Sequence, residues 1–299
     1  MSLENLASAD DPAPRDAVVA LRARPDFAAA MRASANGVVA LYEGSRVLNW
    51  LMDDRGRVLF GYLALHLHYS RDSADASSGL TPTNMKALCA ELDICSPGRV
   101  FAMLSLMRFR GYLMPDPDVT DRRQRRLVAT EKLIAFLRDR WRPHFVAMAP
   151  LFSDGEAILG ALDDPAATRP LVDAMVARFR AGFRLVAHAP DLGLFSERNA
   201  GTLILASLLV SGRADDTVPP SQPVPISISA LARRFSVSRP HVLKLIRDAA
   251  DDGLIERTGQ GGDHILIRPR LAEAAQNFFA TTYLFFADCA RQARITRRR

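Results

Sequence analysis

The sequence has little cysteine and none of the spacings by which cysteine holds a metal ion or builds a disulfide framework. Its 299 residues include three cysteines, Cys89, Cys95 and Cys289. With an odd total and no CxxC pair, reduced thiols in a cytoplasmic protein are the expectation. Cys89 falls among apolar helix positions, and Cys95 falls in a turn without an obvious basic neighbour. We therefore interpret both as small packing residues rather than redox sensors.

Long apolar runs are also missing. The most apolar stretch, residues 200–210, is far too short to cross a bilayer. The first residues do not show the basic and then apolar layout of a signal peptide. These absences predict a soluble cytoplasmic protein without a membrane partner.

The sequence contains no recognisable catalytic motif. There is no Ser/His/Asp arrangement, no Walker loop and no GxGxxG. His66 and His68 are two positions apart in a helical context, so their rings should diverge rather than share a metal ion. We therefore expect no enzymatic activity, no metal site and no other cofactor.

The composition favours an anionic partner. Lys and Arg total 39 against 33 Asp and Glu, which gives a net charge of +6, and the pI is about 9.6. Nucleic acid is one such partner. A hydrophobic content of 48% is enough for folded cores rather than general disorder.

The clearest positive feature is an internal repeat. Residues 81–130 and 224–268 each show a helix, a short turn, a second helix that ends at glycine, and a β-ribbon. Val100 is followed eleven positions later by Gly111, and Val242 by Gly253 at the same spacing. Helix-turn-helix modules usually bind DNA as symmetric dimers. One chain with two unequal copies therefore predicts a single-chain pseudo-dimer.

Local signals define the first copy. Thr81 followed by Pro82 is a typical helix start, and Ser96 is a good N-cap for the second helix. Gly111 suits the left-handed position that ends a helix. Residues 112–129 alternate around a polar tip, which indicates a β-hairpin, and a further helix is predicted at 131–141.

These patterns predict a mainly α fold with small β-wings, in which tandem winged helix-turn-helix modules are joined by a helical dimerisation-like core. We expect a flexible N-terminal segment at 1–25 and a first half at 26–145, with its winged helix at 80–130. The second half, 146–299, should hold helices at 146–215, a winged helix at 224–268 and a C-terminal helix at 270–291.

The first half resembles the MarR family of winged-helix regulators. Asp121-Arg122-Arg123 and the following Leu127-Val-Ala-Thr130-Glu-Lys-Leu are similar to the Asp-Arg-Arg wing motif of that family and the strand and helix after it. The family's usual glycine at that helix start is absent here. The second half resembles winged helices more generally and lacks Asp-Arg-Arg. The resemblance implies a helical dimerisation region, two DNA-binding lobes and transcriptional regulation, often with a small-molecule effector.

The second module carries the clearer set of DNA-contact candidates. Arg and Lys can bond the acceptor edge of guanine, while Ser and a helix N-terminus can hold phosphate. The candidates lie away from the apolar side of the second helix or in the wing: Ser238, Arg239, His241, Lys244 and Arg257. A solvated polar helix face is the alternative interpretation.

The first module gives a mixed prediction. Its second helix begins with Ser96 and Arg99 but also holds Phe101, Ala102, Met103 and Leu106, which cannot all face a core. Its wing is strongly basic, with Arg122, Arg123, Arg125 and Arg126, and wing arginines can enter a narrow minor groove. We include Ser96, Arg99 and these four arginines among the DNA-contact candidates.

Taken together, the sequence predicts a transcriptional regulator that binds double-stranded DNA with unequal half-sites. Two alternatives remain. The chain could be a winged-helix interaction scaffold without sequence-specific DNA binding, for which the apolar helix at 97–109 is the best support. It could also be a DNA binder of the plasmid replication initiator kind. The long outer helices could in addition pair two chains into a homodimer.

Overall fold

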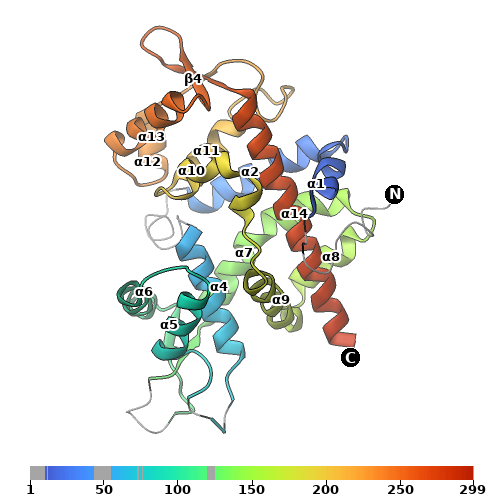
Figure 1. Cartoon of the computed structure of the whole chain (residues 1–299), viewed down its shortest axis with the longest axis vertical. Helices are drawn as coiled ribbons and strands as arrows, with labels where there is room; N and C mark the ends of the chain where they lie inside the picture. The colour runs from blue at the N-terminus through green and yellow to red at the C-terminus, as the bar shows by residue number, and fades with distance from the viewer. Residues whose placement is uncertain are drawn as a thin grey trace. The chain divides into compact units, whose positions relative to one another are not determined.

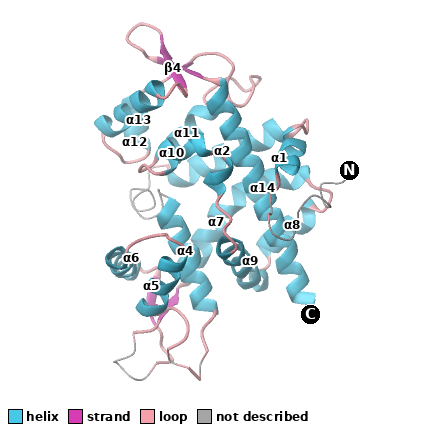
Figure 2. Cartoon of the chain, in the orientation of Figure 1, coloured by secondary structure: helices cyan, strands magenta, loops and turns pink. Residues whose placement is uncertain are grey.

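The chain is mainly helical with two small antiparallel sheets among its described residues (Figure 2). The computed structural model describes residues 11, 13–43, 55–72, 74–75, 77–119 and 125–298. The α-helices are α1 (Arg15–Arg22), α2 (Phe27–Tyr42), α4 (Arg55–Tyr69), α5 (Pro82–Glu91), α6 (Pro97–Phe109), α7 (Glu131–Met148), α8 (Gly155–Asp163), α9 (Thr168–Arg180), α10 (Gly193–Ser196), α11 (Gly201–Leu209), α12 (Ile228–Arg234), α13 (Arg239–Asp251) and α14 (Pro269–Arg298). The strands are β1 (Leu113–Pro115), β2 (Leu127–Ala129), β3 (Val224–Pro225), β4 (Ile255–Thr258) and β5 (His264–Ile267).

The chain divides into two compact units, each assembled from several stretches of sequence. Unit 1 comprises Met1–Arg55, Arg142–Gly160 and Arg184–Asp288, and unit 2 comprises Gly56–Trp141, Ala161–Phe183 and Cys289–Arg299. Four of the five divisions fall inside helices: α4 at its first residue, and α7, α8 and α14. Each unit contains one of the two repeated segments. The expected division of the sequence near residue 145 remains a prediction.

The helical core of unit 1 forms around α2, which packs against α11 (Figure 1). The buried Tyr283 hydroxyl donates to Ser34 Oγ at 2.8 Å, and Ser34 donates to the Pro143 carbonyl at 3.3 Å. Gly37 permits close packing at this point, because an added Cβ would lie 2.6 Å from Pro143 Cβ. The polar groups of Ser34 and Tyr283 are therefore hydrogen-bonded within this close contact.

Part of the segment expected to be flexible, 1–25, forms a helix, while residues 1–10 and 12 lie outside the described residues. Residues 15–22 form α1, whose Ala17, Val18 and Leu21 are buried. Arg22 fixes this helix to α14 by donating to Asn277 Oδ1 and Gln276 Oε1, both at 2.7 Å. The apolar positions of α1 recur at helical spacing, and their burial supplies the stability that a short isolated helix lacks.

The second repeated segment in unit 1 has the predicted elements. Helices α12 and α13 contact each other, and α13 contacts β4 (Figure 1). Strands are ordered β3-β5-β4, with Ile255 opposite Ile267 and Thr258 opposite His264. Gly253 follows α13 at φ +68°, which confirms the predicted left-handed helix end.

The core of unit 2 contains the buried Trp141 side chain of α7. Its Nε1 donates to the Tyr62 hydroxyl at 2.9 Å, and the Tyr62 ring stacks on Phe179 at a centroid distance of 6.5 Å. Helix α7 continues to Met148, beyond the predicted end at 141, and contains Pro143. Helix α14 likewise extends beyond the predicted range of 270–291.

The first repeated segment in unit 2 also shows the predicted local features. Thr81 caps α5 by accepting from Asn84 N, and Gly111 follows α6 at φ +73°. Strands β1 and β2 pair antiparallel, with Met114 opposite Val128. Within the described part of the chain, no helix combines the length and apolar character needed to cross a membrane.

Candidate nucleic-acid interface

Helix α13 is oriented by a cap at one end and an apolar stripe along one side. Ser238 Oγ accepts from His241 N at 3.2 Å, so the cap satisfies one of the N–H groups left over at a helix start. The apolar stripe is fully buried and consists of Val242, Leu245, Ile246 and Ala249. The opposite side of α13 therefore faces outward.

The outward side of α13 is basic. Ser238, Arg239 and Lys244 are exposed, as their predicted role requires. Arg247 is exposed on the same side and was missing from the predicted set. The helical spacing that identified Lys244 also selects Arg247 three positions later, so the signal was present in the sequence.

The Lys244 ammonium is held by a carboxylate. Its Nζ donates to Asp248 Oδ2 at 3.0 Å, and Arg198 Nη2 lies 2.5 Å from the same oxygen. The Lys244 hydrogen bond, together with the Arg198 hydrogen bond and charge, lowers the pKa of Asp248 despite some desolvation. Asp248 is therefore ionised at neutral pH and offsets part of the positive charge here.

His241 is positioned differently from the other candidates. Its Nε2 lies 2.9 Å from the Asn199 carbonyl oxygen. A carbonyl only accepts, so Nε2 carries the proton and donates to it. His241 is partly buried, and this bond connects α13 to the segment before α11. The side chain thus acts in positioning α13, and its predicted DNA contact is not supported by this geometry.

The hairpin between β4 and β5 presents Arg257 beside a glycine turn. Arg257 is exposed, and its Nη2 donates to the Gly262 carbonyl at 3.3 Å. Gly259, Gly261 and Gly262 all have positive φ. An added Cβ at Gly262 would lie 2.8 Å from Arg257 Nη2. Glycine at that position therefore lets the guanidinium lie against the turn.

Helix α6 has the same start as α13 but a different outward side. Ser96 Oγ accepts from Arg99 N at 3.4 Å, and Arg99 is exposed. Among the predicted apolar residues, Met103 is buried, whereas Phe101 is 46% exposed and Ala102 is also exposed. Phe109, at 82%, is far more exposed and was not singled out from the sequence.

A shallow groove lies beside the C-terminal end of α6. Its volume is about 510 Å³. One of its lining residues, Arg108, is an exposed cation. The groove is lined by Ser105, Arg108, Phe109, Gly111, Leu113, Met114, Pro115 and Thr130. It therefore combines exposed apolar surface with positive charge.

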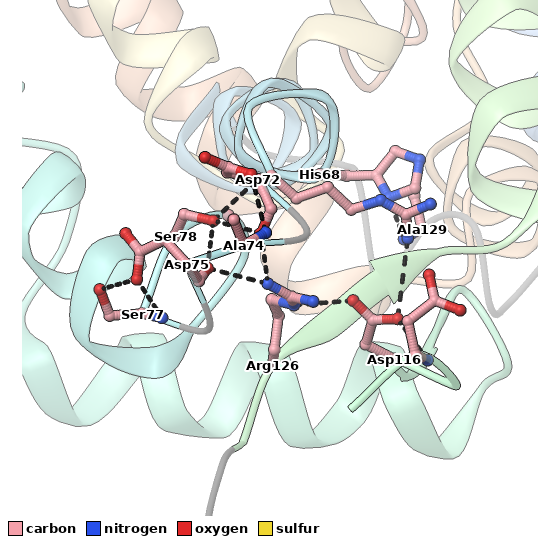
Figure 3. Close-up of polar contacts among 12 residues, drawn as sticks. His68, Asp72, Ala74, Asp75, Ser77, Ser78, Asp116, Arg126 and Ala129 are labelled. Atoms are coloured by element: carbon pink, nitrogen blue, oxygen red, sulfur yellow. Dashed lines mark hydrogen bonds and ion pairs between the residues drawn. The ribbon is translucent and has the colours of Figure 1, made fainter. Parts of the chain in front are cut away.

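The structure assigns Arg126 a different role from the predicted DNA contact. Its side chain is 3% exposed, and its Nε donates to Asp116 Oδ2 at 2.7 Å. Its Nη1 donates to the carbonyls of Asp72 and Asp75 at 2.9 and 3.0 Å (Figure 3). Arg126 therefore joins the base of the hairpin to the segment after α4 and is not available to phosphate.

The Asp116 carboxylate, which is paired with Arg126, is stabilised in its charged form. Burial raises the pKa of Asp116, but hydrogen bonds from Asp118 N and the Arg126 guanidinium outweigh burial and lower it. Arg71 attracts the same carboxylate more weakly, with its Nη1 3.8 Å from Asp116 Oδ1. The pair is thus an ionised, hydrogen-bonded anchor for the first hairpin.

Of the other three wing arginines, only Arg125 belongs to the described residues. Arg125 is exposed, which suits its predicted contact with DNA. Arg122 and Arg123 lie outside the described residues, as does Asp121 of the Asp-Arg-Arg motif. Among the described residues there is no group of three or more His, Cys, Asp or Glu side chains placed to hold a metal ion.

Comparison of the chain with protein-family models, with curated proteins and with solved structures gives no significant match.

Proposed function

We propose that this chain is a DNA-binding transcriptional regulator whose two winged helix-turn-helix modules act as a single-chain pseudo-dimer on unequal half-sites. The observation that carries the proposal is the outward side of α13. A capped helix with exposed Arg239, Lys244 and Arg247 adjoins a hairpin that presents Arg257. Such a helix can enter a major groove while the hairpin arginine contacts the neighbouring phosphates or minor groove.

The modules differ in the contacts they offer. The second module offers cations for phosphate and for guanine edges. The first offers Arg99 and Arg125 together with exposed Phe101, a side chain that can contact thymine methyl groups. Unequal contact surfaces suit an asymmetric DNA site rather than a palindrome.

The experiment compares duplex binding of Lys244→Ala/Arg247→Ala with that of the unaltered chain over a range of salt. Loss of two cation contacts should weaken binding at least about tenfold and make the salt slope shallower by about two. The matched control is Arg24→Ala, which removes an exposed arginine between α1 and α2 and should change neither value. Equal binding by the double variant and the unaltered chain would exclude α13 as the reading helix.

A second candidate function, a protein-interaction scaffold, is favoured by one observation. Phe101 and Phe109 are both exposed on α6, and Phe109 lines the groove described above. Exposed apolar surface of this kind can mark a binding site. On this reading Phe101→Ser/Phe109→Ser would leave duplex affinity unchanged and abolish association with a protein partner. A DNA-contacting α6 instead predicts weaker duplex binding by the same variant.

A further inference from the structure

The segment between α10 and α11 holds α13 at two points along one side of the helix. His241 Nε2 donates to the Asn199 carbonyl, and the Arg198 guanidinium pairs with the Asp248 carboxylate. His241 and Asp248 are seven positions apart in the sequence, which is about two turns of an α-helix, so they lie on the same side of α13. Arg198 and Asn199 therefore support the flank of the helix that carries the proposed DNA contacts.

Lys244 shares the Asp248 carboxylate with Arg198. Its Nζ donates to Asp248 Oδ1 at 3.1 Å and to Oδ2 at 3.0 Å. The Lys244 side chain is 67% exposed, whereas those of Arg198 and Asp248 are 28% and 23% exposed. Exposed ion pairs contribute little to stability, so Lys244 can leave the carboxylate at low cost. The Arg198–Asp248 pair is more sheltered from water and persists when Lys244 leaves.

The Asp248 carboxylate and a DNA phosphate bind the same kind of group. Both offer anionic oxygens, and the Lys244 ammonium is a donor without an acceptor of its own. A phosphate that approaches Lys244 also approaches the carboxylate, and the two negative charges repel each other. This repulsion is smaller when a second cation compensates the carboxylate. Arg198 supplies that cation from outside the repeated segment 224–268.

We propose that Asp248 competes with the DNA phosphate for Lys244, and that Arg198 determines how readily Asp248 releases it. In the free chain both cations share the carboxylate. On duplex binding Lys244 moves to a phosphate while Asp248 remains paired with Arg198, so that no uncompensated carboxylate lies beside the DNA. Arg198 is thus a positioning residue for the contact. This inference rests on the proposed function, because it assigns roles within the DNA contact of α13.

The first test compares Asp248→Asn with Asp252→Asn by fluorescence anisotropy with random duplex DNA at low salt. Asp252 is exposed and lies one turn further along the same side of α13, so each variant removes one negative charge from that side. Asp248→Asn should bind at least about fivefold more tightly than the unaltered chain, because Lys244 loses its competing ligand. Asp252→Asn should gain less than about twofold. Equal gains would overturn the proposal, since net charge alone would explain them.

The second test is a double-mutant cycle that removes Arg198 with and without the carboxylate. Arg198→Gln should weaken duplex binding about fivefold, because Asp248 then holds Lys244 alone and stays uncompensated beside the phosphate. In the Asp248→Asn background the same substitution should change affinity by less than about twofold. An equal loss in both backgrounds would overturn the proposal, since Arg198 would then contact DNA directly or act only on the fold.

The same measurements separate this inference from the proposed function. If every variant binds the duplex with the affinity of the unaltered chain, the competition is excluded while DNA binding itself is intact. If neither the unaltered chain nor any variant binds at low salt, the proposed function and this inference fail together. Arg198→Lys keeps a cation beside Asp248 and should bind more tightly than Arg198→Gln. Equal weakness of these two variants would show that the charge of Arg198 is not what matters.

Discussion

At the scale of single residues, arginines that are adjacent in sequence have different roles. Arg125 is exposed, whereas Arg126 is buried against Asp116 and two carbonyls. Removing one partner of a buried ion pair leaves the other charge without compensation, which costs about 3–5 kcal/mol. The roles of neighbouring arginines are therefore decided by the partners that the fold brings to each.

This contrast gives a prediction about stability. Arg126→Ala should lower the free energy of unfolding by about 3 kcal/mol or more, while Arg125→Ala should change it by less than about 0.5 kcal/mol. Urea denaturation of both variants measures the difference. Arg126→Lys should recover only part of the loss, because an ammonium lacks the planar fork that reaches Asp116 and the carbonyls together. Equal free energies of unfolding for the two alanine variants would show that the Arg126–Asp116 pair does not stabilise the fold.

A second residue-scale prediction concerns pH. His68 Nδ1 accepts from Ala129 N at 3.2 Å (Figure 3), so the ring is neutral in the folded state. Burial, with a smaller contribution from Arg71, lowers the pKa of His68 below 6.5, although Asp116 opposes the shift. The unfolded chain therefore binds a proton first as pH falls below about 6.5, and the folded state loses stability.

The measurement is the thermal unfolding midpoint of the unaltered chain and of His68→Asn at pH 7.5 and 5.5. Asparagine keeps an acceptor that can reach Ala129 N but does not titrate. The drop in midpoint between the two pH values should be smaller in the variant. An equal or larger drop in His68→Asn would assign the pH dependence to other groups.

At the scale of elements, Ser238 has two roles that substitution can separate. Its Oγ caps α13 by accepting from His241 N, and its exposed position is part of the proposed DNA contact. Ser238→Ala should lower the free energy of unfolding by about 1 kcal/mol through loss of the cap. Ser238→Asp should preserve stability, since aspartate also caps helices, but should weaken duplex binding because its charge repels phosphate.

Denaturation and duplex titration of these two variants provide the comparison. If Ser238→Asp binds DNA as tightly as the unaltered chain, the start of α13 does not lie against the phosphates.

The helix caps and the glycines that end the helices could be predicted from the sequence. Ser96, Ser238, Gly111 and Gly253 act through neighbours within a few residues, and their local signals are strong.

Other features of the elements could not be predicted from sequence. Burial of Arg126 depends on carbonyls that lie 54 and 51 positions away, and no local pattern encodes such a pairing. The left-handed turn after α5 depends on Asp93, where a residue other than glycine adopts positive φ. Arg247 is the exception, because helical spacing alone would have identified it.

At the scale of the whole molecule, the proposal combines two modules of unequal character in one chain. The second module presents an exposed basic helix side, and the first presents exposed aromatic rings beside basic residues. The expected fold class was confirmed at the level of a mainly helical chain with small antiparallel sheets. The tandem winged-helix arrangement and the pseudo-dimer remain predictions.

The most direct measurement of the central claim is duplex binding by the unaltered chain, followed by fluorescence anisotropy with random and genomic DNA at several salt concentrations. We expect binding that depends on DNA sequence, with an association constant that falls linearly with salt concentration on a log–log plot, at a slope of about −0.9 for each phosphate neutralised. Some genomic fragments should bind at least about a thousandfold more tightly than random DNA. Absence of duplex binding at low salt would show that the chain is not a DNA-binding regulator of this kind.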